Sequence, residues 1–191
     1  MYLFFDTETT GLPGNGKAPV TDLDNWPRMV QLAYLFSDSN GNKISEGNFI
    51  IKPVGFTIPA KAVEVHGITT ERAEKEGTDL KIVLLDFQAL ISRAEYLVAH
   101  NMDFDGKVIG AEFLRNKMRD GLPAKRKICT MLSAIDYCAL PGPFGYKWPK
   151  LTELHCKLFQ KGFDDAHNAA ADVLATVRCF WELKRLGIIK V

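Results

Sequence analysis

The chain begins with an apolar, aromatic segment that turns acidic within a few positions. Residues 2–8 read YLFFDTE, and a short run of this kind is typical of a buried strand. Asp6 and Glu8 are two positions apart, so in a strand both side chains point to the same face. Carboxylates placed in this way repel each other unless something neutralises them, and a divalent cation does so directly. A plain strand end that meets solvent is the alternative, and this segment alone leaves it open.

Strand and helix patterns alternate along the rest of the chain. They predict an α/β fold with a mixed sheet, in which a hairpin part comes first. Strands are expected at residues 29–36, 43–53, 96–101 and 125–130; helices are expected within 59–69 and at 79–92, 104–119, 130–139, 151–159 and 168–186. Gly121-Leu122-Pro123 is expected to end the helix that begins at 104. The apolar stripe of the last helix is expected to consist of Ala170, Val173, Leu174, Val177 and Trp181.

Composition limits the classes of protein that the chain can belong to. Its 191 residues, 47% hydrophobic and 25% charged, favour one globular domain spanning residues 1–191. The formal net charge of +1 gives no global positive field, so an anionic substrate must be held by a local site. The four cysteines form no C-x-x-C pair, which argues against a zinc ribbon and favours free thiols in a reducing compartment. Because we find neither a signal peptide nor a membrane span, we expect a cytoplasmic protein.

A second polar cluster follows the strand expected at 96–101. Asn101, Asp103 and Asp105 occupy alternate positions where a helix is expected to begin. Capping explains one of these groups, and Asp103 is the expected N-cap of a helix that starts at Phe104. Capping does not easily explain all three, so Asp105 is expected in the first turn, beside the first strand.

A third polar cluster lies near the C-terminus, where His167 and Asp172 are five positions apart. On one continuous helix they would point about 140° apart. They can therefore share a site only if His167 lies on the loop before the helix and Asp172 on the helix itself. A loop histidine and a solvated carboxylate are the alternative.

Together the three clusters offer four carboxylates and one histidine. Asp6, Glu8, Asp105 and Asp172 supply only oxygen ligands, which suits Mg²⁺ or Mn²⁺ better than zinc. Two such ions would reverse the repulsion between the carboxylates and a phosphate. His167 can take a proton at neutral pH.

This ordered set of motifs resembles the DEDDh class of 3′–5′ exonucleases (DnaQ-like, RNase H-like superfamily). The class includes the proofreading subunit of bacterial DNA polymerase III, RNase T and oligoribonuclease. The D-x-E motif matches residues 6–8, N-x-x-F-D matches 101–105, and H-x-x-x-x-D matches 167–172; VHGIT at 65–69 resembles the substrate-pocket segment of the family. The matches extend from residue 4 to residue 172.

The resemblance implies a five-stranded sheet in the order 3-2-1-4-5. It implies two divalent ions, with Asp6, Glu8 and Asp172 as principal ligands and Asp105 at the second ion. His167 would be the general base, which completes a catalytic set of five residues. The 3′-terminal nucleotide would be held by Thr9, Gly11, Leu12, His66, Asn101 and Phe104. Core packing is the alternative for Leu12 and Phe104, and a role in the turn is the alternative for His66.

Two loops depart from the compact pattern of the family. Residues 12–27 leave the first motif and are expected near the site. Residues 140–150 carry Phe144, Tyr146, Lys147 and Trp148, which could stack on single-stranded bases or pack against the edge of the sheet.

The expected activity is release of nucleoside 5′-monophosphates from the 3′ ends of single-stranded nucleic acid, with DNA weakly favoured over RNA. An RNA exonuclease similar to oligoribonuclease and a catalytically idle binding module are alternatives. A phosphatase of the D-x-D-x-T type is a third alternative, although Glu8 replaces its second aspartate. The few residues after Leu186 favour a free-standing enzyme, while a DNA polymerase partner, and with it proofreading or repair, stays open.

Overall fold

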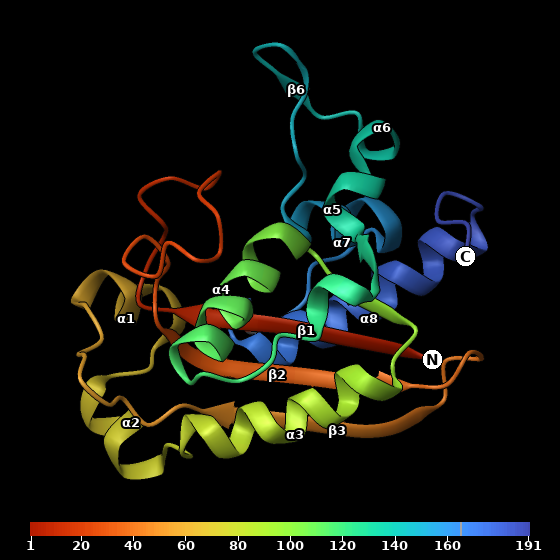
Figure 1. Ribbon diagram of the computed structural model, residues 1–191. Coiled ribbons are helices and arrows are strands. Elements are labelled where there is room, and N and C mark those ends of the chain that lie inside the picture. Colours follow the sequence, from red (N-terminus) through yellow and green to blue (C-terminus); the bar gives the residue numbers. More distant parts are fainter. Residues whose placement is uncertain (165) are drawn as a thin grey trace.

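A five-stranded mixed sheet lies between two layers of helices (Figure 1). The computed structural model describes residues 1–164 and 166–191. The strand order is β3-β2-β1-β4-β5, so the order expected from the family resemblance is confirmed. The strands are β1 (Tyr2–Thr9), β2 (Met29–Ser37), β3 (Lys43–Ile50), β4 (Tyr96–Ala99) and β5 (Arg126–Cys129). β2 pairs antiparallel with β1 and β3, whereas β4 pairs parallel with β1 and β5.

Helices cover both faces of this sheet. α3 and α4 pack on one face, and α7 and α8 pack on the other. α1 and α2 form a smaller apolar cluster at the start of β2. The helices are α1 (Ala60–His66), α2 (Thr70–Glu76), α3 (Leu80–Arg93), α4 (Met102–Arg115), α5 (Thr130–Ser133), α6 (Ile135–Cys138), α7 (Leu151–Phe159) and α8 (Ala169–Arg185), with a 3-10 turn at Leu122–Ala124. In the part of the chain that the structure describes, no helix is both long and apolar enough to cross a membrane.

The alternation of side chains along β1 determines where its polar end points. Leu3 and Phe5 lie in the core against α3 and α4, and Phe5 meets the ring of Phe87. Phe4 points to the opposite face and packs against Phe180 of α8. Continued along the strand, the same alternation directs Asp6 and Glu8 toward α8 and Thr7 toward α4.

The expected start and end of the helix at 104–119 are wrong. α4 begins at Met102 because β4 already ends at Ala99, and Asn101 occupies the N-cap position. Asp103 is therefore not the cap; it lies in the first turn, 2.9 Å from the ammonium of Lys107. The helix ends at Arg115, ahead of the expected Gly-Leu-Pro stop, because Lys117 adopts a left-handed backbone with φ 54°.

Three further expectations about helices are corrected. The helix expected at 130–139 is two short helices, α5 and α6, separated at the fully buried Ala134. Leu174, expected in the apolar stripe of the last helix, is 51% exposed, and the buried face includes Thr176 and Phe180 instead. α2 was not expected at all, because its sequence TERAEKE shows no apolar periodicity.

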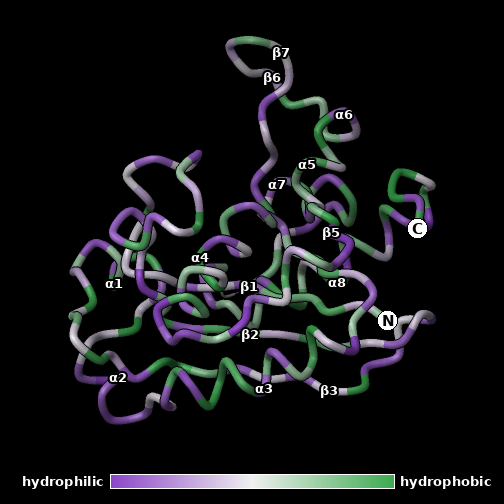
Figure 2. Tube along the Cα trace, viewed as in Figure 1, coloured by the Kyte–Doolittle hydropathy of each residue, from purple (hydrophilic) through white to green (hydrophobic). Residues whose placement is uncertain are grey.

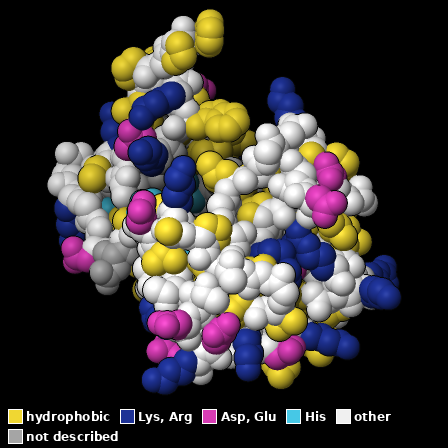
Figure 3. All heavy atoms as spheres, turned by 90° about the vertical axis from the view of Figure 1, so that its left-hand side faces the viewer, with side chains coloured by type: hydrophobic (Ala, Val, Ile, Leu, Met, Phe, Trp, Pro, Cys, Tyr) yellow, Lys and Arg dark blue, Asp and Glu magenta, His cyan; other side chains and the backbone are white. Residues whose placement is uncertain are grey.

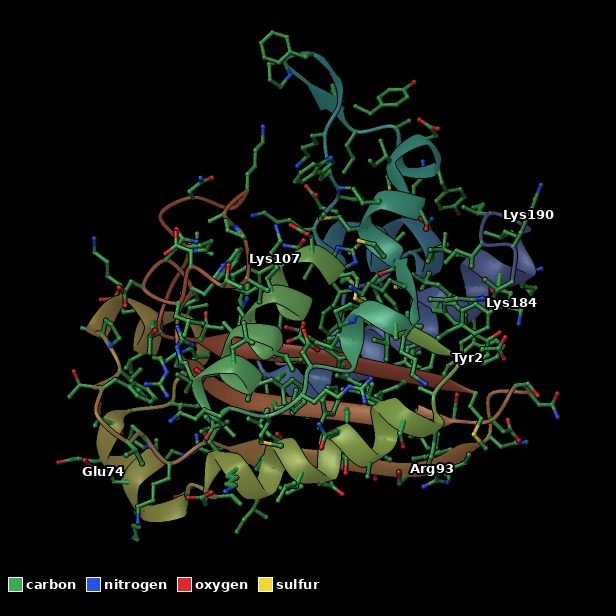
Figure 4. All side chains as sticks on the ribbon, in the orientation of Figure 1. Tyr2, Glu74, Arg93, Lys107, Lys184 and Lys190 are labelled. Carbon is green, nitrogen blue, oxygen red and sulfur yellow. The ribbon has the colours of Figure 1, made fainter. Side chains whose placement is uncertain are left out.

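The two unusual loops adopt different structures. Residues 12–27 fold back onto α4, where Lys107 reaches the carbonyl oxygen of Gly16 at 3.0 Å (Figure 4). Residues 140–150 form an arm that contains the short hairpin β6 (Pro141–Gly142) and β7 (Gly145–Tyr146) and projects from the body (Figure 1). The tip of this arm is hydrophobic although it lies far from the core (Figure 2). The alternative in which these residues pack against the edge of the sheet is therefore wrong.

Candidate active site

Three carboxylates meet where β1 ends. Asp6 and Glu8 come from β1, and Asp172 comes from the first turn of α8. One oxygen of each side chain can be chosen so that all three lie within 4.8 Å of one another. The sequence placed these residues in one site, and the structure brings them together.

The start of α8 is held in register with β1 by Gln31. This residue lies on β2 directly opposite Glu8 and is 4% exposed. Its side-chain oxygen Oε1 accepts the N–H of Ala169 at 3.4 Å, while its side-chain nitrogen Nε2 donates to Asn48 Oδ1 at 2.7 Å. Sequence reasoning missed this positioning residue; the available signal was an amide within the apolar run MVQLAYLF.

Asp105 approaches the end of β1 from the other face of the sheet. It lies on α4, is 3% exposed, and does not belong to the three-carboxylate cluster. Its Oδ1 accepts two hydrogen bonds from Thr7, one from the backbone N–H at 3.1 Å and one from the hydroxyl at 2.8 Å. Thr7 therefore fixes Asp105 beside Asp6 and Glu8, a role that the sequence analysis did not assign.

His167 lies on the loop that leads into α8, while Asp172 lies on the helix proper, so the arrangement required for a shared site is present. The backbone N–H of His167 donates to Asp172 Oδ2 at 3.1 Å. Its backbone has φ 71°, a left-handed conformation that is costly for a residue with a Cβ. The ring is exposed to solvent and available to a substrate.

Burial and mutual repulsion oppose ionisation of these carboxyl groups. Burial, and then the charges of Asp172 and Asp105, raise the pKa of Glu8 to about 8. Burial is also the main cause that raises the pKa of Asp6 and of Asp172, and repulsion adds to it at Asp6. Burial raises the pKa of Asp105 to about 7, although the two hydrogen bonds from Thr7 oppose the shift. A cation among these groups would restore their charge, because it favours the ionised form.

A cavity of about 650 Å³ opens beside Glu8. Five of the six residues predicted to hold the terminal nucleotide line it: Thr9, Gly11, Leu12, His66 and Phe104. The sixth, Asn101, is exposed at the start of α4 and is not among the lining residues. Leu12 is 86% exposed, so core packing does not explain it. Lys61 and Val65 of α1 also line the cavity, and the sequence analysis did not assign them.

His66 presents an unsatisfied donor at this cavity. Its Nδ1 accepts the backbone N–H of Ile68 at 3.1 Å, so in the neutral ring the proton is on Nε2. Nε2 is buried and has no hydrogen-bond partner among the described residues. Burial lowers the pKa of His66, which favours this neutral form, although the nearby backbone of Thr9 opposes the shift.

Comparisons with known proteins find relatives of this chain. The family model RNase_T, described as "Exonuclease", matches residues 3–180. An uncharacterized exonuclease of Escherichia phage 186, CP81, is 30% identical over an alignment of 183 residues that covers 92% of this chain and 84% of that protein.

Solved structures of E. coli exonuclease I show the same fold. A complex with a dA16 oligonucleotide has a TM-score of 0.73 at 23% identity, and it covers 96% of this chain but 40% of that protein. A complex with dT13 has a TM-score of 0.75 at 23% identity, with 97% and 42% covered. The chain thus spans about two fifths of the length of exonuclease I.

Proposed function

Because the chain belongs to the exonuclease family, as a 3′–5′ exonuclease of the DEDDh type, we propose that it removes nucleoside 5′-monophosphates from the 3′ ends of single-stranded DNA. The observation that carries this proposal is the meeting of Asp6, Glu8 and Asp172 beside the cavity at Glu8. Binding of DNA oligonucleotides by exonuclease I, which shares the fold, supports DNA as the substrate.

Divalent cations fit the ligands that this site offers. The clustered ligands are all oxygens, the choice of Mg²⁺ and Mn²⁺, and their raised pKa values indicate that positive charge is needed among them. In our proposal Asp6, Glu8 and Asp172 hold one ion and Asp105 serves a second. Bound ions would supply neutralising charge for the phosphate and polarise the attacking and leaving oxygens.

His167 acts as the general base in this proposal. Its exposed ring can take the proton from the water that attacks phosphorus, while its backbone N–H holds Asp172. This hydrogen bond keeps the proposed general base, His167, close to the proposed metal ligand, Asp172. Replacing His167 with alanine is expected to lower kcat by about 10²–10⁴-fold, the usual contribution of a general base.

The cavity receives the 3′-terminal nucleotide. Backbone groups near Thr9 and Gly11 would contact its sugar and phosphate, and the exposed Leu12 would wedge against its base, with Phe104 on the cavity wall and Asn101 at its margin. His66 Nε2–H would donate to an oxygen of the nucleotide, which gives its unsatisfied donor a partner.

We extend the proposal to the protein's organisation and setting. Residues 1–191 would form one exonuclease domain, since the family match covers 3–180. The four free cysteines suit a reducing cytoplasm. A DNA polymerase is the partner that would turn such an activity to proofreading or repair.

A gel assay with two matched variants tests the proposal. 5′-labelled DNA and RNA strands of equal sequence are incubated with the protein and Mg²⁺ or Mn²⁺, with a chelator control. We expect a ladder that shortens from the 3′ end, faster on DNA, and that disappears in chelator. Asp105→Asn should abolish it, whereas Asp103→Asn, two positions away but exposed and paired with Lys107, should not.

Two results would count against this function. Full activity of the Asp105→Asn protein would show that the active site has been assigned wrongly. Intact strands with both metals would favour an idle binding module. A faster ladder on RNA would instead correct the substrate and retain the reaction.

A further inference from the structure

The projecting arm, residues 140–150, carries an unusual set of exposed rings. Phe144 is fully exposed, Tyr146 is 56% exposed and Trp148 is 64% exposed. Among the Phe, Tyr and Trp residues within 1–164 and 166–191, only these three are exposed, and all of them lie on the arm. Large apolar groups gathered on a projecting segment indicate a binding surface.

The arm is held firmly at its base and free at its tip. His100, which follows β4, donates from Nε2 to the carbonyl oxygen of Pro149 at 2.9 Å. The N–H of Lys147 donates to the carbonyl oxygen of Leu140 at 2.9 Å, which closes the hairpin. Lys147 also pairs with Glu153 at the start of α7. The base of the arm is therefore fixed in position, while the three rings are not packed into the core.

The base of the arm lies next to the segment that carries Asp105. His100 directly precedes the segment 101–105, which carries Asp105. At its other end the arm leads into α7 and then into the loop of His167. In Figure 3, which shows the face at which β1 ends, hydrophobic side chains gather on the projection at the top, with Lys and Arg side chains just below them.

The cavity and the arm approach the end of β1 on different elements. Residues 7–12, α1 and Phe104 of α4 line the cavity, whereas His100, directly after β4, fastens the base of the arm. β4 lies next to β1 in the sheet. A strand whose 3′-terminal nucleotide fills the cavity can pass the carboxylates at the end of β1 and continue toward the arm.

We propose that this arm is a stacking platform for the single strand upstream of the scissile bond, in which the rings of Phe144, Tyr146 and Trp148 bind bases. The inference rests on the proposed function for the direction of the strand. Aromatic faces bind bases of any sequence, and the neighbouring cation Lys150 suits the phosphates. Long strands would then bind better than short ones, whatever their sequence.

Equilibrium binding in chelator tests the platform without hydrolysis. Fluorescence anisotropy of labelled dT20 gives Kd for the wild type and for the triple variant Phe144→Ala, Tyr146→Ala, Trp148→Ala. Loss of one stacked base is expected to raise Kd by about 5- to 150-fold. Ile82→Ala is the matched control, since Ile82 is 62% exposed but lies on α3. Trp148→Phe keeps a ring and should retain most of the affinity.

Hydrolysis of two substrate lengths separates this inference from the function on which it rests. With Mg²⁺, the triple variant should lose kcat/KM on dT20 and keep it on a trinucleotide, which is too short to reach the arm. If the wild type cleaves neither substrate, the proposed function fails, while the Kd values still decide whether the arm binds DNA.

Three results would overturn the platform. They are an unchanged Kd for dT20, an equal loss on both substrate lengths, and a change in oligomeric state on gel filtration with DNA binding intact. The last would identify the arm as a protein contact. An unchanged Tm shows that the variant is folded, as expected for side chains outside the core.

Discussion

Two loops flank the end of β1, and they are built in opposite ways. Residues 12–27 are fastened along their length, whereas residues 140–150 are fastened only at the base. Trp26 in the first loop is 3% exposed and donates from Nε1 to the carbonyl oxygen of Pro19 at 3.0 Å. Trp148 in the second is 64% exposed. The same side chain thus serves as an anchor in one loop and as a free surface in the other.

A buried carboxylate on α4 explains why the first loop is so well held. Glu112 is fully buried and lies within 3.0 Å of two arginines, Arg28 and Arg115. Arg115 in turn donates to the carbonyl oxygens of Leu23 and Trp26, each at 2.6 Å. The backbone carbonyls of the loop therefore have partners inside the protein. No comparable buried charge holds the arm among the residues described, so its side chains are left for a ligand.

The largest difference between the loops should appear when their tryptophans are removed. Trp26→Ala should lower the free energy of unfolding by about 3–5 kcal/mol, the usual loss for a buried aromatic residue. Trp148→Ala should change it by no more than about 0.5 kcal/mol. Urea unfolding of both variants measures the contrast, and equal losses would show that the two loops are anchored alike.

The carboxylate cluster that both loops border should make the stability of the whole protein depend on pH. In chelator, the unfolded chain releases the proton of Glu8 near its ordinary pKa of 4.5, while the folded protein retains it to about pH 8. The free energy of unfolding should therefore fall, by on the order of 5 kcal/mol, as pH rises through this window. Asp6→Asn removes a second carboxyl group whose pKa is raised by burial and should flatten the slope.

Unfolding in chelator at several pH values measures this slope. Adding Mg²⁺ should abolish it, because a bound cation stabilises the ionised groups. Stability that rises with pH in chelator would contradict the raised pKa values of the cluster.

The base of the arm should weaken in acid. Burial lowers the pKa of His100 to about 4, so between about pH 6.5 and 4 the unfolded chain binds a proton that the folded protein does not. Stability should fall as pH drops through this window, by about 2–3 kcal/mol. His100→Gln cannot titrate, and the difference in unfolding free energy between it and the wild type should shrink toward pH 4. A difference independent of pH would mean that His100 does not titrate as described.

The smallest effect is expected for the outermost fastening of the first loop. Lys107 bonds Gly16 and Asp103 near the surface, so Lys107→Ala should lower stability by less than about 1 kcal/mol. Lys43→Ala, which removes an exposed pair with Glu46 at the far end of the sheet, is the control. A loss as large as that of Trp26→Ala would show that the surface bonds of Lys107, and not the buried ring of Trp26 alone, hold the loop in place.

Much of the candidate site could be predicted because its signals are local. The alternation of Asp6 and Glu8 specifies one face of a strand, and the spacing from His167 to Asp172 requires a loop followed by a helix. The antiparallel hairpin likewise follows from the Asn-Gly turn at its tip. These features depend on neighbouring residues, so the sequence alone carries them.

The remainder depends on contacts between distant segments. Gln31 lies opposite Glu8 only because of the strand register, and Thr7 meets Asp105 only because α4 packs on that face. The helix at 130–139 breaks at Ala134, where a buried residue stands between α5 and α6. The exposure of the arm depends on what the rest of the fold leaves uncovered, which no local pattern records.

The position of Asp172 has a consequence for how the protein is made. Asp6 and Glu8 lie on β1, but the third member of their cluster, Asp172, lies on α8 and is synthesised more than 160 residues later. Until α8 has been made, the growing chain holds two of these carboxylates without the third. Any activity that depends on all three is therefore absent from the chain before that point.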